Sequence, residues 1–162
     1  MRNPVAVAVL LLLACSAAAE TLPKAPDRHV TDRAGVLNQA ETDELERMLT
    51  RLETDGLAQT IVYLDRAVPS SEPSLEAYTL RLANAWGVGS RKRNDGVVIF
   101  VFMNDRRMRI EVGLGLEKVL TDDVARKIID GDLKPAFREG RFGEGLKRAI
   151  ESIRRTLERA ER

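Results

Sequence analysis

The chain has 162 residues, enough for one domain with a hydrophobic core, and carries 26 Lys and Arg against 25 Asp and Glu. This balance lacks the basic excess typical of nucleic-acid-binding proteins, and only 4% of the residues are aromatic, which leaves little for base stacking. We therefore expect no nucleic-acid partner. Cys15 is the one cysteine in the chain, so no disulfide can form within it.

The first 19 residues have the pattern of a signal peptide. Arg2 gives a positive start, residues 5–14 are apolar, and small residues precede Glu20. The apolar run is too short to cross a bilayer, which takes roughly 20 residues, and no later stretch reaches that length. We expect cleavage after Ala19, export to the periplasm, and no transmembrane helix in the mature chain.

The sequence also fits a second kind of signal-peptide cleavage. The Leu-Leu-Ala-Cys run ending at Cys15 resembles a lipoprotein signal, in which the lipidated cysteine becomes the first mature residue, although Leu13 departs from the residue usual there. The alternatives are thus a free periplasmic protein and a lipoprotein anchored through Cys15. Since Arg2 is the only charged residue before Glu20, the free form would carry 25 basic and 25 acidic residues.

The mature chain is expected to form a single domain over residues 29–160. Residues 20–28 contain two prolines and no periodicity, which predicts a flexible lead-in. Asn38 with Glu41 predicts a capping box at the start of a helix that ends at Gly56. Residues 59–64 are β-branched and aromatic, as in a buried strand.

A second helix should begin after Ser74 and end near Trp86. Residues 96–102 are continuously apolar, which is typical of a strand covered on both faces, and residues 108–112 alternate like an edge strand. Thr121 predicts the cap of a third helix.

A last helix is expected after Gly143. The order of elements predicts two parallel strands joined by a right-handed helical crossover, followed by a hairpin. The sequence therefore indicates an α/β fold with a small mixed β-sheet covered by helices.

Three carboxylates are expected to converge at one end of this sheet. Asp95 precedes the central strand, the hairpin returns the chain to the same end at Glu117, and Asp122 begins the next helix there. Oxygen ligands gathered from loops suit calcium. The alternative is a turn residue for Asp95 and a first-turn helix acid for Asp122, whereas neither role explains Glu117.

Basic residues form two groups at opposite ends of the central strand. They are Arg91, Lys92 and Arg93 before it, and Arg106, Arg107 and Arg109 around the hairpin. Solvated loop charge is the expected role, and an anion contact through Arg91 and Arg93 is the alternative. Trp86, beside glycines at 87 and 89, either packs the helix end or lines a groove.

Several common catalytic sites are excluded. His29 is the only histidine, which excludes a Ser-His-Asp triad and a histidine-built zinc site. The glycines at 113 and 115 lack the third glycine of a dinucleotide fingerprint, because Lys118 stands in its place. Residues 130–133 resemble an aspartyl-phosphate motif, but they follow a helix rather than a strand.

Several segments in register resemble the TPM domain family over about residues 28 to 155. The segments are 30–37 (VTDRAGVL), 86–89 (WGVG), 94–99 (NDGVVI), 109–117 (RIEVGLGLE), 120–122, 128–129, 135–137 and 140–145. The resemblance implies a Rossmann-like α/β/α sandwich with helices on both faces of the sheet. It also adds Asp32 to Asp95, Glu117 and Asp122 as candidate metal ligands.

The resemblance implies two functions of different classes. Family members include thylakoid-lumen proteins linked to photosystem II repair and an auxiliary protein of a nematode acetylcholine receptor, and both calcium binding and acid phosphatase activity are attributed to members. The first expectation is a calcium-binding module that helps an envelope protein complex to assemble. The alternative is a metal-assisted acid phosphatase acting on phosphomonoesters. The sequence shows no dedicated nucleophile, and only Arg91 or Arg93 near Asp95 could clamp a phosphate.

Overall fold

A computed structural model describes residues 22–160, so the predicted signal peptide and Cys15 lie outside the described part of the chain. Four strands form one sheet in the order β1 (Val30–Asp32), β2 (Gln59–Asp65), β3 (Gly96–Phe102) and β4 (Arg107–Val112). The first three strands are parallel and β4 is antiparallel to β3. β4 is therefore an edge strand, as its alternating sequence predicts.

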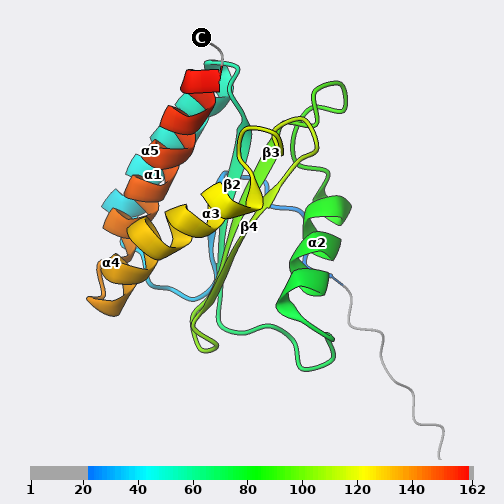
Figure 1. The fold of residues 1–162 in the computed structure, drawn as a ribbon. Helices are drawn as coiled ribbons and strands as arrows, with labels where there is room; N and C mark the ends of the chain where they lie inside the picture. Colours follow the sequence, from blue (N-terminus) through cyan, green and yellow to red (C-terminus); the bar gives the residue numbers. More distant parts are fainter. Residues whose placement is uncertain (1–21, 161–162) are drawn as a thin grey trace, which may run out of the picture.

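Helices cover both faces of the sheet. They are α1 (Gln39–Thr54), α2 (Leu75–Trp86), α3 (Asp122–Ile128), the π-helical turn η1 (Ile129–Leu133), α4 (Lys134–Arg138) and α5 (Phe142–Ala160). In Figure 1, α2 lies on one side of the sheet and the other labelled helices lie on the opposite side. This arrangement confirms the mixed sheet and the α/β/α sandwich.

The central strand explains why its sequence is continuously apolar. All seven residues of β3 are buried. Val97, Ile99 and Val101 belong to the core under α1 and α5, whereas the alternate residues belong to a second core under α2. Because successive side chains of a strand point to opposite faces, a strand between two helix layers needs apolar side chains at every position.

The predicted helix starts and ends are confirmed by their caps. Asn38 and Glu41 form a capping box at α1, and the side chains of Ser74 and Thr121 accept backbone N–H bonds at α2 and α3. Gly87 ends α2 in the left-handed conformation, with φ +60°. α5 begins two residues earlier than predicted, at Phe142.

The strand β1 was not predicted from the sequence. β1 spans three residues and pairs in parallel with β2, Val30 lying opposite Val62. Only Val30 is buried in β1, so the strand is too short for a readable alternation.

Residues 22–29 form no helix or strand, although Leu22 packs on the core under α2. Whether residues 20–28 are flexible stays a prediction. Between residues 22 and 160, no helix combines the length and the apolar character needed to cross a membrane.

Candidate functional site

The loop before β3 and the loop after β4 meet at the end of the sheet where β3 begins, as predicted. A Cβ atom on Gly115 would stand 1.8 Å from the carbonyl oxygen of Arg93, and one on Gly113 would stand 2.2 Å from that of Asn94. On Gly96 it would stand 2.0 Å from the carbonyl oxygen of Val88. Backbone therefore occupies the space of these missing side chains, and only glycine permits so close an approach.

Asp95 holds this junction together. Its side chain is only 5% exposed, and Oδ1 accepts a 2.7 Å hydrogen bond from the Ser90 N–H. Oδ2 lies 2.5 Å from Nη2 of Arg93 in an ion pair that is not aligned as a hydrogen bond. Arg93 also donates to the Gly56 carbonyl at 2.7 Å. Asp95 and Arg93 thus neutralise each other and fix the loop before β3.

Asp32 lies at the opposite end of the sheet. It closes β1 beside Leu64, near the end of β2, whereas Asp95 precedes β3 where β2 begins. Its carboxylate accepts 2.8 Å hydrogen bonds from the backbone N–H groups of the turn at Gly35, Val36 and Leu37. The structure therefore separates Asp32 from the other three predicted ligands, and its observed role is to cap a turn.

Glu117 and Asp122 are both exposed, but they line different hollows. In the part of the chain from residue 22 to residue 160, no three Asp, Glu, His or Cys side chains gather closely enough to hold a metal ion. The four candidate ligands therefore do not form a common calcium site in this structure. Calcium binding stays a prediction from the family resemblance.

Trp86 packs against the sheet. Its ring centroid lies 5.0 Å from that of Tyr63 and 5.6 Å from that of Phe100, and its Nε1 donates a 2.9 Å hydrogen bond to the Pro23 carbonyl. Trp86 is half-buried rather than exposed. Of the two alternatives from the sequence, packing of the helix end is the one observed.

A hollow of about 360 Å³ lies between the end of α2 and the loop after β4, and we call it the loop hollow. Arg91 and Glu117 line it, together with Leu80 and Leu114, which are 53% and 74% exposed. These leucines could not be predicted to be exposed, because a lone leucine in a helix or loop gives no sequence signal of exposure.

The two faces of β4 differ in chemistry. The register places Arg107, Arg109 and Glu111 opposite the β3 residues that face α2, and Met108 and Ile110 opposite those that face α5. On the α2 side, Glu111 accepts hydrogen bonds at its Oε1 from Arg109 at 2.5 Å and from Thr79 of α2 at 2.6 Å.

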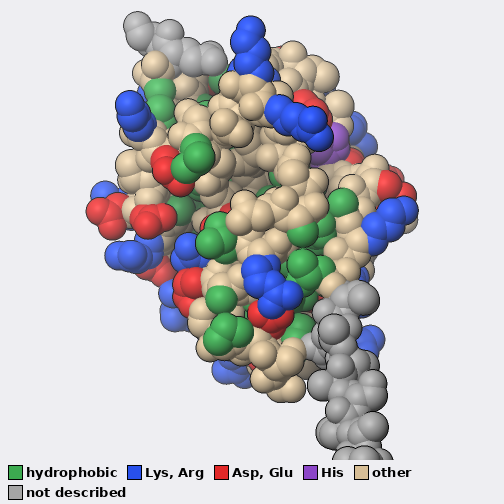
Figure 2. Space-filling model, turned by 90° about the vertical axis from the view of Figure 1, so that its right-hand side faces the viewer, with side chains coloured by type: hydrophobic (Ala, Val, Ile, Leu, Met, Phe, Trp, Pro, Cys, Tyr) green, Lys and Arg blue, Asp and Glu red, His purple; other side chains and the backbone are tan. Residues whose placement is uncertain are grey.

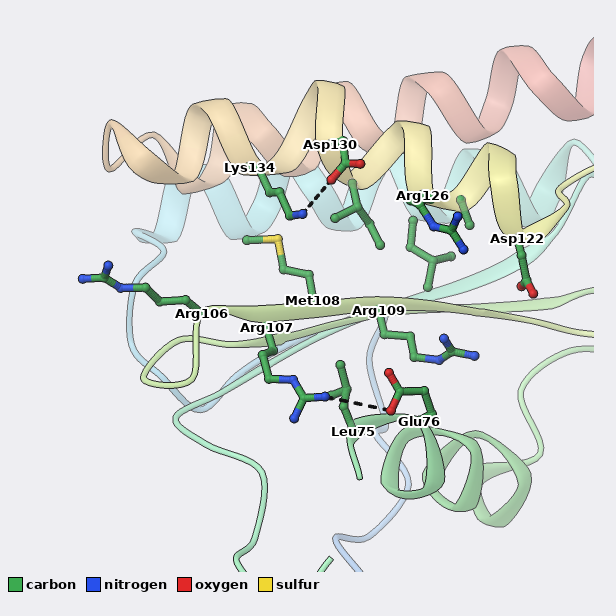
Figure 3. A pocket seen from close by; sticks show the side chains of 13 residues that line it. Leu75, Glu76, Arg106, Arg107, Met108, Arg109, Asp122, Arg126, Asp130 and Lys134 are labelled. Carbon is green, nitrogen blue, oxygen red and sulfur yellow. Dashed lines mark hydrogen bonds and ion pairs between the residues drawn. The ribbon is translucent and has the colours of Figure 1, made fainter. Parts of the chain in front are cut away.

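A second cleft, of about 410 Å³, runs along β4 between α2 and the α3–η1 segment. Five basic side chains and three acidic side chains line it, and we call it the basic cleft. The basic residues are Arg106, Arg107, Arg109, Arg126 and Lys134, and the acidic residues are Glu76, Asp122 and Asp130. In Figure 3, Arg107 and Arg109 come from the strand, whereas Arg126 and Lys134 extend from the helical layer on its other side.

Four of the five basic side chains of the basic cleft have an acidic partner: Arg109 lies 2.5 Å from Glu111 and Arg126 lies 3.6 Å from Asp123, two acids that do not line the cleft. Lys134 Nζ lies 2.6 Å from Asp130, and Arg107 Nη2 lies 3.9 Å from Glu76. A hydrogen bond from its own backbone N–H, supported by Ser74 and by the nearby arginines, lowers the pKa of the Glu76 carboxyl. Arg106 forms no ion pair with any residue that the structure describes.

The basic cleft continues into an apolar hollow of about 500 Å³ at the hairpin end of β4. Met103, Met108, Phe137 and Phe142 line this hollow, and the two phenylalanine rings meet edge to face at 5.1 Å. Met108 and Lys134 line both spaces. On the face drawn in Figure 2, acidic and basic side chains are interspersed, so single-sign charge does not extend across that face.

The TPM domain model matches residues 30–156, which is most of the chain. The chain belongs to the TPM domain family. It is similar to the N-terminal domain of a P. gingivalis protein, with 32% identity and a TM-score of 0.73 over 82% of this chain and 83% of that one. No curated protein matches it.

Two further solved structures share the fold. The N-terminal domain of the Corynebacterium glutamicum protein cg2496 has a TM-score of 0.60 at 14% identity, covering 86% of this chain and 85% of that one. The BA42 protein of the psychrophilic bacterium Bizionia argentinensis has a TM-score of 0.54 at 19% identity, covering 76% of this chain and 82% of that one. At these identities the likeness concerns the fold alone.

In this TPM domain, several residues of the segments that carry the family resemblance have structural roles. The glycines at 89, 96, 113 and 115 admit backbone contacts, and Asp32 and Asp95 bind backbone N–H groups. The basic cleft includes Arg109 and Asp122 from these segments, and it combines them with residues of α3 and α4 that no single segment of sequence brings together. Sequence reasoning grouped only its hairpin arginines, and treated them as solvated charge.

Proposed function

We propose that this TPM domain is an exported binding module of the cell envelope that holds an anionic partner protein in its basic cleft. The observation that carries this proposal is that five basic and three acidic side chains line the cleft along the edge strand β4, and that Arg106 has no ion pair among residues 22–160. The arginine side chains come from both walls of the cleft, so carboxylates of a partner could be contacted from two sides. Planar guanidinium groups suit such contacts because they can donate two hydrogen bonds to one carboxylate.

The rest of the molecule supports a binding role. Asp95 and Arg93 are bound to each other, and Asp32 caps a turn, so these groups are not free to activate a nucleophile. The basic cleft is open and shallow enough to contact a protein surface, and its charged side chains are 34% to 71% exposed for Arg109, Arg107 and Arg126. Binding there should be fast and sensitive to salt.

A titration with an acidic peptide tests this proposal. The probe is acetyl-Thr-Glu-Thr-Glu-Thr-Glu-Phe-amide, and the protein is the chain from Glu20 to Arg162. Calorimetry should show binding that weakens as salt is raised, and the double variant Arg107→Glu/Arg126→Glu should weaken it more than tenfold. Arg155→Glu on α5 is the matched control, because Arg155 is exposed and does not line the cleft. Equal affinity for all three proteins would overturn the proposal.

A metal-assisted phosphatase is the second candidate. It is favoured by the name of the matched family model, TPM phosphatase, and by the exposed carboxylate of Asp122 in the same cleft as Arg109 and Arg126. Arginines beside a carboxylate could hold a phosphomonoester near an acidic group. Turnover of p-nitrophenyl phosphate that is lost in Asp122→Asn would favour this candidate, and its absence with every divalent metal tried would remove it.

A further inference from the structure

The backbone of β4 has an unpaired edge. The Gly113 N–H donates a 2.7 Å hydrogen bond to the Gly96 carbonyl, and these two residues are opposite each other in the β3–β4 register. Because hydrogen-bonded pairs alternate along antiparallel strands, Glu111, Arg109 and Arg107 also bond to β3. The N–H and C=O groups of the residues between them then point to the outer edge.

These outward residues are Met108, Ile110 and Val112. Within residues 22–160, the backbone N–H and C=O groups of these three residues form no hydrogen bond outside the sheet. Such an edge is a template for another strand, and proteins usually block it with charge or cover it. Here it lies at the floor of the basic cleft, between α2 and α3. Met108 and Val112 are partly exposed, whereas Ile110 is only 4% exposed, so an added strand has to displace the side chains that cover Ile110.

The charge around the edge selects what can pair with it. Two copies of this chain paired through β4 would bring two basic clefts together, which like-charge repulsion disfavours. An acidic strand would instead place carboxylates near Arg107 and Arg109 on one face and near Arg126 and Lys134 on the other. Alternating side chains of an added strand point to both faces, so both sets of basic groups can be used.

The apolar hollow adds a second element of recognition. It continues the basic cleft past the hairpin end of β4 and is lined by Met103, Phe137 and Phe142. A strand that follows β4 to this end would bring its terminal residue over the hollow. A large apolar side chain there would remove these rings and the methionine from water.

We propose that β4 accepts an extended acidic segment of a partner protein as a fifth strand, with one large apolar residue of the segment in the apolar hollow. This inference rests on the proposed function of the basic cleft and specifies the form of the ligand. β4 has six residues, and at about 3.3 Å per residue a paired segment would extend roughly 20 Å. Main-chain hydrogen bonds would supply affinity, and the charges and the hollow would supply specificity.

Backbone methylation of the probe tests strand addition separately from charge. The peptide acetyl-Thr-Glu-Thr-Glu-Thr-Glu-Phe-amide is compared with two forms that are N-methylated at alternate residues. In one form the methyl groups lie along one edge of the peptide strand, and in the other form they lie along the opposite edge. One form should lose affinity at least tenfold and the other should bind nearly as the parent does, because only one edge pairs with β4. The parent should also slow hydrogen exchange at Ile110 and Val112.

The outcomes separate the two proposals. If both methylated forms bind as tightly as the parent, and cleft charge reversal still weakens binding, strand addition is wrong and the basic cleft stands. If no form binds, both proposals fail. Replacing the terminal Phe of the peptide by Ala should lower affinity about tenfold, and unchanged affinity would overturn the assignment of the apolar hollow.

Discussion

Gly115 and Arg93 approach so closely that no other residue fits at position 115, since a Cβ there would stand 1.8 Å from the Arg93 carbonyl oxygen. This contact joins the loop after β4 to the loop before β3. It accounts for a glycine in the family segment without any role in ligand binding.

Gly115→Ala is therefore expected to destabilise the domain by about 1–3 kcal/mol, the usual cost of forcing atoms into an occupied space. Urea denaturation followed by circular dichroism measures this change. Gly131→Ala is the matched control, because a Cβ on Gly131 meets nothing within 4 Å. The control should be neutral or slightly stabilising. Equal midpoints for the two variants would contradict the contact.

Asp95→Asn is expected to lower the free energy of unfolding by roughly 1–3 kcal/mol without any added metal, because it removes the charged partner of Arg93 in a buried position. A double-mutant cycle with Arg93→Gln should show that the two changes are not additive. A loss of stability that appeared only in the presence of calcium would instead indicate a metal ligand.

Asp32→Ala should destabilise the domain by about 1–3 kcal/mol both with and without millimolar calcium, because three backbone N–H groups lose their acceptor. Thermal unfolding in the two conditions measures this. Calcium binding predicted from the family resemblance is tested in the same experiment. A thermal shift of the wild type by calcium that Glu117→Gln abolishes and Asp32→Ala retains would place a metal site near the loop hollow.

The acidic residues show where sequence reasoning stops. Topology alone brought Asp95 and Glu117 to one end of the sheet, because a hairpin must return the chain to that end. What each carboxylate binds depends on a few ångströms of loop geometry, and Arg93 takes the position next to Asp95. Asp32 joined the candidate ligands through the family resemblance, and topology could not show that it lies at the other end of the sheet, because β1 is too short for any readable periodicity.

The basic cleft was harder to predict from the sequence than the positions of the acidic residues. The alternation in β4 revealed an edge strand, and the caps at Asn38, Ser74 and Thr121 fixed where helices begin. Helix packing then decides which basic residues of α3 and α4 face β4. That packing depends on the core as a whole, and local sequence patterns do not specify it.

Tyr63 should make the stability of the domain fall at alkaline pH. Burial, together with the hydrogen bond to Asp65, raises the pKa of the Tyr63 hydroxyl. Its contribution is fully present below the unfolded pKa of about 10 and is lost as the pH rises above that value, because the unfolded state then releases the proton first. The urea midpoint should drop between pH 8 and pH 11, and Tyr63→Phe should drop less. An equal drop in both proteins would contradict this.

Chemical-shift mapping of the acidic peptide on the labelled chain tests the central claim most directly. The account predicts that the largest shifts fall on β4 and on α3, η1 and α4, the elements that line the basic cleft, with Ile110 among the most affected. Shifts centred on Leu80, Arg91 and Leu114 would place the ligand in the loop hollow instead and would contradict the account. Shifts scattered over the whole surface would mean that no binding site for acidic segments exists on this domain.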